Sequence, residues 1–121
     1  MLNIKSIREY CLNKNGVSES FPFDEVTLVF KVMNKMFCLA NITSPLRINL
    51  KCSPEMAIEL RERYAAVIPG YHMNKRHWNT IMIDNIYETN LIWEWIDNSY
   101  HLVTKSLTKK DKLELQKLLE E

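Results

Sequence analysis

The chain is 121 residues long, which is enough for one domain with a single hydrophobic core and too short for two. Apolar residues make up 46% of the chain and charged residues 26%, proportions typical of a globular protein, so the composition excludes wholesale disorder. The formal net charge of +1 excludes a grossly basic nucleic-acid-binding protein.

The first predicted element is a short amphipathic helix that begins at Asn3. Its apolar residues recur on one helical stripe, and Gly16 lies just beyond it, where a left-handed C-terminal cap is common. Residues 18–24, around Pro22, are predicted to form a loop.

Three strands are predicted next, over residues 26–32, 36–42 and 46–52, because each segment is rich in β-branched and apolar residues. Asn34 lies between the first two and suits the positive φ of a tight hairpin. The third strand alternates most clearly, with its apolar residues facing the core. Its polar residues share the opposite face: Arg47, Asn49 and Lys51.

A second helix is predicted from Ser53, which is followed by proline and an acidic residue as helix starts usually are. It extends to about residues 64–66, and Pro69-Gly70 is predicted to terminate it. Residues 78–83 are again typical of a strand, and Asp84-Asn85 is typical of a turn.

The remaining chain is predicted to be helical from about Thr89. The segment Asp97-Asn98-Ser99 indicates either the cap of a further helix or a kink. Thr108 begins a capping box, so residues 108–121 are predicted to form a C-terminal helical extension of a single domain spanning 1–121. The short links between strands indicate an α+β fold, an antiparallel sheet of about five strands with helices packed on it.

Four segments together resemble the MmcQ/YjbR family: residues 35–37, 48–55, 71–80 and 99–103, over a likeness that spans roughly residues 1–107. The resemblance implies the order α-β(3)-α-β(2)-α, to which this chain adds its C-terminal helix. It also implies a DNA-binding protein with a double-wing surface, since members are commonly described so. That description rests on structural analogy.

Charge is distributed unevenly along the chain. Residues 31–78 carry eight basic and three acidic side chains, whereas the rest carries eight basic and twelve acidic ones. A basic middle segment of this kind can form one positive face.

The candidate nucleic-acid-binding residues lie on the third strand and in the segment that precedes residues 78–83. They are Arg47, Lys51, Lys75, Arg76, His77 and Trp78. The four cations are expected to neutralise phosphates, the histidine to donate a hydrogen bond, and the indole to stack on a base if it is exposed. The alternatives are that Trp78 fills the core at the start of a strand and that Lys75-Arg76 is an ordinary exposed turn.

No catalytic, metal or cofactor site is predicted. The histidines His72 and His77 are badly spaced for catalysis or metal binding, and no HExxH, paired carboxylates or triad order occurs. The three cysteines form no CxxC pair and are interpreted as small buried apolar residues. With no signal-peptide h-region and no membrane-spanning run, the chain is expected to be cytoplasmic.

The sequence therefore predicts a non-enzymatic protein that contacts DNA phosphates weakly, without strong sequence specificity and without a cofactor. DNA is the expected partner; no membrane and no small-molecule substrate is expected. The alternative is a protein-interaction or chaperone-like module with no role in nucleic-acid binding.

Overall fold

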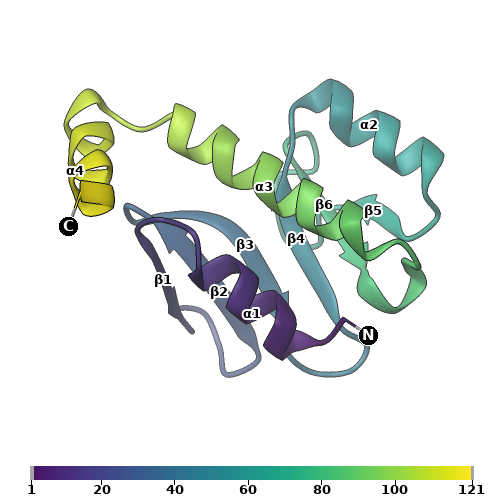
Figure 1. Ribbon diagram of the computed structural model, residues 1–121. Coiled ribbons are helices and arrows are strands. Elements are labelled where there is room, and N and C mark those ends of the chain that lie inside the picture. The colour runs from purple at the N-terminus through teal and green to yellow at the C-terminus, as the bar shows by residue number, and fades with distance from the viewer. Residues whose placement is uncertain (1, 121) are drawn as a thin grey trace.

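The protein is described here by a computed structural model that covers residues 2–120. Six antiparallel strands form one sheet in the order β1-β2-β3-β4-β6-β5 (Figure 1). The strands are β1 (Val17–Ser20), β2 (Thr27–Val32), β3 (Lys35–Asn41), β4 (Arg47–Lys51), β5 (Val67–Pro69) and β6 (Trp78–Met82). The helices are α1 (Ile4–Leu12), α2 (Pro54–Arg63), α3 (Thr89–Lys105) and α4 (Lys109–Glu120), with a 3-10 turn, η1, at Ile83–Asn85.

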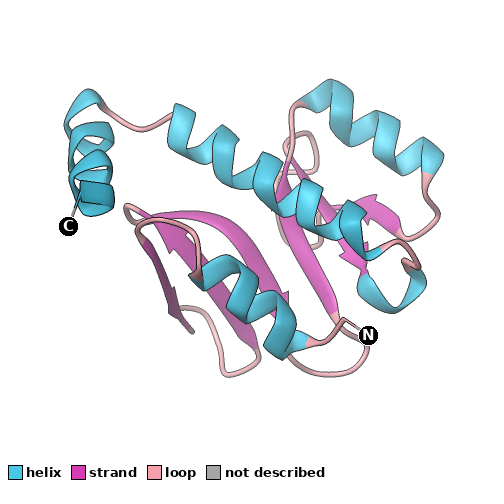
Figure 2. Cartoon of the chain, in the orientation of Figure 1, coloured by secondary structure: helices cyan, strands magenta, loops and turns pink. Residues whose placement is uncertain are grey.

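The helices α1, α2 and α3 cover one face of the sheet (Figure 2). The main core lies between them and the sheet, and Phe30, Ile48 and Ile96 are fully buried within it. Within residues 2–120, no helix packs on the opposite face of the sheet, which we call the open face. This architecture confirms the predicted α+β class, with six strands where about five were expected.

The two-residue hairpin between β2 and β3 follows the prediction. Asn34 has a φ of +67° and Met33 a φ of +49°, the left-handed pair that a tight hairpin needs. A β-bulge follows, because Phe30 pairs with Cys38 whereas the next residue of β2 pairs with Met36. Phe37 is therefore left without a register partner, and both it and Cys38 are fully buried.

One strand was not predicted, and another lies in a segment to which no strand was assigned. Residues 17–20 form the edge strand β1, although residues 18–24 were expected to be a loop. Residues 67–69 form β5, although Pro69-Gly70 was expected only to end a helix; α2 ends earlier, at Arg63. Both are short edge strands, and the sheet supplies the one neighbour that each requires.

Helix α3 is continuous over 17 residues, so the expectation of a new cap or a kink at Asp97-Asn98-Ser99 was wrong. Ser99 is fully buried, and its hydroxyl accepts a hydrogen bond from the Lys51 backbone N–H (2.9 Å). The same hydroxyl donates to the carbonyl of Phe37 (2.5 Å), the residue that the bulge leaves unpaired. A residue that resembled a helix break thus joins α3 to two strands.

The starts of α2 and α4 follow the predicted capping, whereas the end of α1 does not: its C-cap is Asn13 in the right-handed region, and Gly16 has its positive φ (+72°) in the turn that follows. Ser53 is the N-cap of α2 and accepts from the Met56 N–H. Thr108 accepts from the Asp111 N–H at the start of α4 (3.1 Å). α4 lies against the turn at Gly16, where Leu115 packs on the main core and its carbonyl accepts from the Asn15 amide (2.7 Å). Within residues 2–120, no helix combines the length and apolar character needed to cross a bilayer.

The three cysteines are buried free thiols, as predicted. A hydrogen bond with Cys11 and burial together raise the pKa of the Cys38 thiol well above its ordinary value. Burial likewise raises the pKa of Cys52 to about 11. Since the thiolate is the reactive form, these groups act as apolar packing.

A polar cluster joins α1 to α3 and makes stability depend on pH. Burial raises the pKa of the Tyr10 hydroxyl to about 12, and its hydrogen bond to Asp97 (2.7 Å) adds to the effect. Burial alone would raise the pKa of Asp97, but hydrogen bonds from Lys14 and Tyr10 outweigh it and hold that pKa below its ordinary value. The Lys14 ammonium also lies 4.9 Å from the centre of the Tyr10 ring.

Asp97→Asn is expected to lower the free energy of unfolding at pH 7 by about 0.5–1 kcal/mol, a small effect because the pair is partly exposed. A carboxyl group whose pKa is lowered by folding stabilises the protein above its unfolded pKa of about 3.9 and loses that effect as the pH falls through the lower folded value. Urea unfolding at a series of pH values measures this: the difference between the proteins should shrink as the pH falls below about 4 and vanish once the pH lies below the lowered folded pKa of Asp97. Asp84→Asn, at an exposed carboxylate, is the control, and an equal pH dependence of all three proteins would contradict the role of Asp97.

Candidate nucleic-acid interface

The open face carries a second, smaller apolar cluster. Val29, Leu39 and Trp78 are its buried members, and Met36 and Met73 cover them. Met73 comes from the connection between β5 and β6, residues 70–77, which we call the β5–β6 loop. The loop therefore folds over the open face and does not project into solvent.

Backbone geometry at Gly70 sets the path of the β5–β6 loop. The Gly70 N–H donates to the carbonyl of Trp78 (2.9 Å). A side chain at this position would place its Cβ 2.8 Å from that same oxygen, which is closer than real contacts allow. His72 adopts a φ of +59°, which turns the chain back toward the sheet.

The far end of the β5–β6 loop is tied to α2 by Arg61. Its Nε donates to the side-chain oxygen of the buried Asn79 (2.7 Å), and its guanidinium also donates to the carbonyl of Lys75. Asn79 in turn donates to the carbonyl of Ala57 in α2 (3.2 Å). A buried asparagine in an apolar strand was the signal in the sequence for this anchor, which the sequence reasoning did not use.

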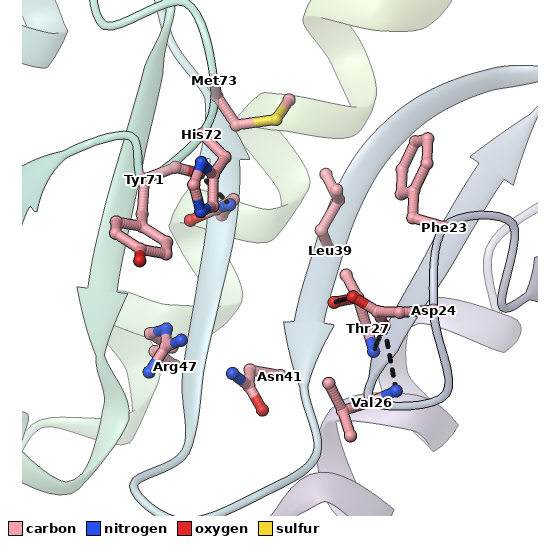
Figure 3. A pocket seen from close by; sticks show the side chains of 11 residues that line it. Phe23, Asp24, Val26, Thr27, Leu39, Asn41, Arg47, Tyr71, His72 and Met73 are labelled. Atoms are coloured by element: carbon pink, nitrogen blue, oxygen red, sulfur yellow. Dashed lines mark hydrogen bonds between the residues drawn. The ribbon is translucent and has the colours of Figure 1, made fainter.

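A groove of about 380 Å³ crosses the open face beside the apolar cluster (Figure 3). Its floor is formed by β3 and β4, including Leu39, Asn41 and Asn49. One wall is the start of the β5–β6 loop, residues 71–73, and the other is the connection before β2, residues 23–26. Three segments distant in sequence thus form one site.

Arg47 supplies the positive charge of the groove. Its guanidinium carbon lies 5.4 Å from the centre of the Tyr71 ring, a cation–π distance. No group within residues 2–120 accepts a hydrogen bond from this guanidinium or forms an ion pair with it. Since arginine remains charged at any physiological pH, it is available to an anionic ligand.

The wall beside Arg47 is held by a short hydrogen-bond chain. Thr80 accepts from the Tyr71 N–H (2.9 Å) and donates to the side-chain oxygen of Asn49. The Asn49 amide donates weakly to the Tyr71 carbonyl (3.4 Å). Tyr71 is therefore positioned before any ligand binds, and 55% of its surface remains exposed.

On the opposite wall, Asp24 is occupied by its own loop. Its carboxylate accepts from the backbone N–H groups of Val26 (2.9 Å) and Thr27 (2.7 Å), which lower its pKa below the ordinary value. The same residue accepts from the Thr27 hydroxyl (3.1 Å). Phe23, next to it, has 64% of its surface exposed at the rim.

Trp78 is not available for stacking. Only 8% of its surface is exposed, because the ring lies in the apolar cluster under Met36 and Met73. The structure thus agrees with the core interpretation of Trp78, and the condition for stacking is not met. The exposed rings on this side are Tyr71 and Phe23, which the sequence reasoning missed.

Of the four predicted cations, Arg47 and Lys51 lie on the open face of β4, and Lys75 and Arg76 lie in the β5–β6 loop. Lys51 pairs with Trp78 in the sheet register, so it lies beside the loop that carries Lys75 and Arg76. Arg47 is four residues from Lys51 on the same strand, about 13 Å away at the usual rise per residue. Arg76 is exposed, whereas the Lys75 ammonium donates to the Gly70 carbonyl (2.9 Å) and helps to hold the loop.

His77 is the sixth predicted residue and is half-buried. Its carbonyl accepts from the Cys52 N–H (2.8 Å), so its backbone extends the sheet next to β4. His72, which lay outside the prediction, is the exposed histidine at the groove, where its ring lies 4.1 Å from that of Tyr71. Within residues 2–120, no three histidine, cysteine or carboxylate side chains are grouped to hold a metal ion.

The fold and the site together define a class: a small α+β protein with one helix-covered face and one open, groove-bearing face of its sheet. The YjbR family model matches residues 12–102. The chain belongs to the YjbR family.

Relatives from two bacterial lineages match most of the chain. YjbR of Escherichia coli K12 is 29% identical over 110 residues, which is 90% of this chain and 93% of that protein. YbdF of Escherichia coli O157:H7 is 36% identical over 95 residues, 75% of each chain. YyaQ of Bacillus subtilis is 27% identical over 117 residues, 84% of this chain and 98% of that protein.

Solved structures share the fold. The crystal structure of the Deinococcus radiodurans protein DR2400 matches with a TM-score of 0.88 and 41% sequence identity, and it covers 96% of this chain and 89% of that one. A Pseudomonas syringae protein matches with a TM-score of 0.73 at 24% identity, which shows a common fold.

Proposed function

We propose that this protein binds single-stranded nucleic acid, DNA in the first instance, through the open face of its sheet. The observation that carries the proposal is that Arg47, Lys51 and the exposed rings of Tyr71 and Phe23 lie on one face of the sheet, which no helix within residues 2–120 covers, with Arg76 exposed in the neighbouring loop. Arg47, Lys51 and Arg76 form no ion pair within residues 2–120, although carboxylates are nearly as numerous as cations in the chain. Cations left without partners are the usual basis of phosphate contacts.

A single strand fits this surface better than a duplex. The exposed rings of Tyr71 and Phe23 offer stacking surfaces, and only unpaired bases can present their faces to them. Within residues 2–120, the open face carries strands and loops and no helix that could enter a major groove. The contacts are therefore mainly to phosphates, and the binding is weak and without strong sequence specificity.

In this proposal the chain is not an enzyme, and each residue has a binding role. Arg47 neutralises a phosphate at the groove, and Lys51 and Arg76 neutralise others along the strand. Lys75 contributes positive charge, and its ammonium also supports the β5–β6 loop. His77 donates a hydrogen bond to the strand at the end of this loop. Trp78 acts indirectly, by supporting Met73 and the loop wall.

A second candidate function is protein interaction, and one observation favours it. Three leucines of α4 each have 45% or more of their surface exposed: Leu113 (63%), Leu118 (45%) and Leu119 (65%). Exposed large apolar side chains are a common feature of protein-binding surfaces. A module of this kind would not need the open face to bind nucleic acid.

A salt titration separates the two functions. Binding of a fluorescent single strand of about 12 nucleotides should weaken steeply between about 20 and 200 mM salt, because phosphate contacts release counterions. Arg76→Ala should weaken binding at low salt and reduce the slope of log affinity against log salt by about 0.7, the effect of one phosphate contact on a single strand. Fluorescence anisotropy measures both quantities.

Lys110→Ala is the matched control, because this exposed lysine lies in the first turn of α4 and its removal changes the net charge equally. Its slope should equal that of the wild-type protein. If no oligonucleotide binds at low salt, the proposal fails and the protein-interaction function is favoured. If both variants lower the slope equally, binding follows net charge and the open face is not the interface.

A further inference from the structure

We infer that the groove beside Arg47 holds one unpaired base of the bound strand and prefers a base with a carbonyl edge, thymine, uracil or guanine, over adenine and cytosine. The inference rests on the proposed function and specifies its ligand. It follows from the hydrogen-bonding groups that the groove leaves free, which are almost all donors.

The free groups on the floor are amide hydrogens. The side-chain oxygen of Asn41 accepts from the N–H and the hydroxyl of Thr43 (2.9 and 2.5 Å), so this turn fixes the orientation of its amide. Figure 3 shows the Asn41 amide nitrogen on the side of Arg47, with the oxygen turned away. The Asn49 oxygen is likewise used by Thr80, which leaves its amide as a donor.

The wall adds further donors. The guanidinium of Arg47 has five N–H groups, and none is bonded within residues 2–120. Arginine often contacts two neighbouring acceptors on a base edge, as it does with the oxygen and nitrogen of guanine. The guanidinium also lies within cation–π distance of the Tyr71 ring, which favours its position at the groove.

Much of the acceptor capacity of the site is already used. The carboxylate of Asp24 is the acidic side chain that lines the groove, and it accepts from three donors of its own loop. An exocyclic amine of adenine or cytosine would therefore face other N–H donors in the groove, the amides of Asn41 and Asn49 and the guanidinium of Arg47. A buried amine without an acceptor is penalised, whereas a carbonyl oxygen would find several partners.

The size and the walls of the groove suit a base. A volume of about 380 Å³ lies at the lower end of the range of small-molecule sites, roughly 300–1,000 Å³, so there is room for one nucleotide. Tyr71 and His72 form one side and Phe23 the other (Figure 3). The floor beneath is partly apolar through Leu39.

The test compares homopolymer strands at one low salt concentration. Oligo(dT) should bind about five- to tenfold more tightly than oligo(dC) or oligo(dA) of equal length, the effect of one or two net hydrogen bonds. Asn41→Asp should remove most of this preference, because it replaces the amide donor with an acceptor while keeping the oxygen that Thr43 uses. The ratio of the two affinities is the readout, since the added negative charge weakens all strands alike.

Asn90→Asp is the matched control. It makes the same change of charge at an exposed position in the first turn of α3, on the helix-covered side, and should leave the ratio unchanged. Circular dichroism shows whether each variant is folded. Thymidine monophosphate, added as a competitor, should displace oligo(dT) only weakly because it lacks the neighbouring phosphates.

The possible outcomes distinguish the base preference of the groove from the proposed binding of nucleic acid. If all three strands bind with equal, salt-dependent affinity, the base preference is wrong and the proposed function stands. If none binds, both are wrong. If Asn90→Asp alters the ratio as much as Asn41→Asp, or if the free nucleotide competes as well as the strand does, the groove is not a base site within a strand.

Discussion

Trp78→Ala is expected to lower the free energy of unfolding by about 3–5 kcal/mol, the usual effect of removing a large aromatic side chain from a packed site. The ring is the largest member of the apolar cluster on the open face, where it supports Met36 and Met73. No helix covers this side, so nothing else can fill the space that the ring leaves. The β5–β6 loop should lose its packing at the same time.

Urea unfolding followed by circular dichroism measures this effect, because the signal does not depend on the tryptophan that is removed. Trp78→Phe is the control and should destabilise by much less, since it keeps an aromatic ring in the cluster. It should also bind oligonucleotides as the wild-type protein does. A large loss of binding in a folded Trp78→Phe protein would show that the indole itself contacts the ligand.

Ser99→Ala is expected to lower the free energy of unfolding by about 2–4 kcal/mol, although it removes one oxygen atom. The hydroxyl is the partner of the Lys51 N–H and of the Phe37 carbonyl. Both groups are left without a partner by the substitution, and each unsatisfied group inside a protein costs about 1–3 kcal/mol.

Ser106→Ala is the comparison, because this hydroxyl caps the end of α3 at an exposed position and donates to Val103 (2.7 Å). Its loss should reduce the free energy of unfolding by less than about 1 kcal/mol, since water can replace the bond. Amide hydrogen exchange at Lys51 provides a local readout. Equal destabilisation by the two substitutions would contradict the bridging role of Ser99.

Most elements of the fold could be predicted from local patterns. The alternation in β4, the cap at Ser53 and the hairpin at Asn34 each depend on a few neighbouring residues. The missed strands depend on distant ones. β1 is Val-Ser-Glu-Ser, a polar segment without strand propensity, and it is extended because β2 offers it a partner.

Dependence on distant residues also explains why a cap or kink was wrongly predicted at Ser99. Its neighbours are turn-forming residues, so local chemistry favours a break at that point. The helix continues because the hydroxyl finds its partners on the sheet, more than 40 positions away in the sequence. The β-bulge at Phe37 creates one of those partners, and the local sequence pattern does not predict it.

One part of the candidate site could be predicted from local sequence, and the other part could not. The shared face of Arg47, Asn49 and Lys51 was predictable because strands alternate by two. The groove was not, since its walls come from residues 23–26 and 71–73 and meet only in the folded sheet. Burial of Trp78 likewise depends on Met73, which folds back over it.

The walls of the groove in Figure 3 are held by hydrogen bonds within the protein, and this has a kinetic consequence. Hydrogen bonds at Gly70, Thr80 and Arg61 already hold the β5–β6 loop, so binding does not have to order it. Association should then be a single fast step at a rate set by diffusion and charge, without a slower rearrangement. For a nucleic-acid strand, the ligand proposed above, weak affinity would then come from rapid dissociation.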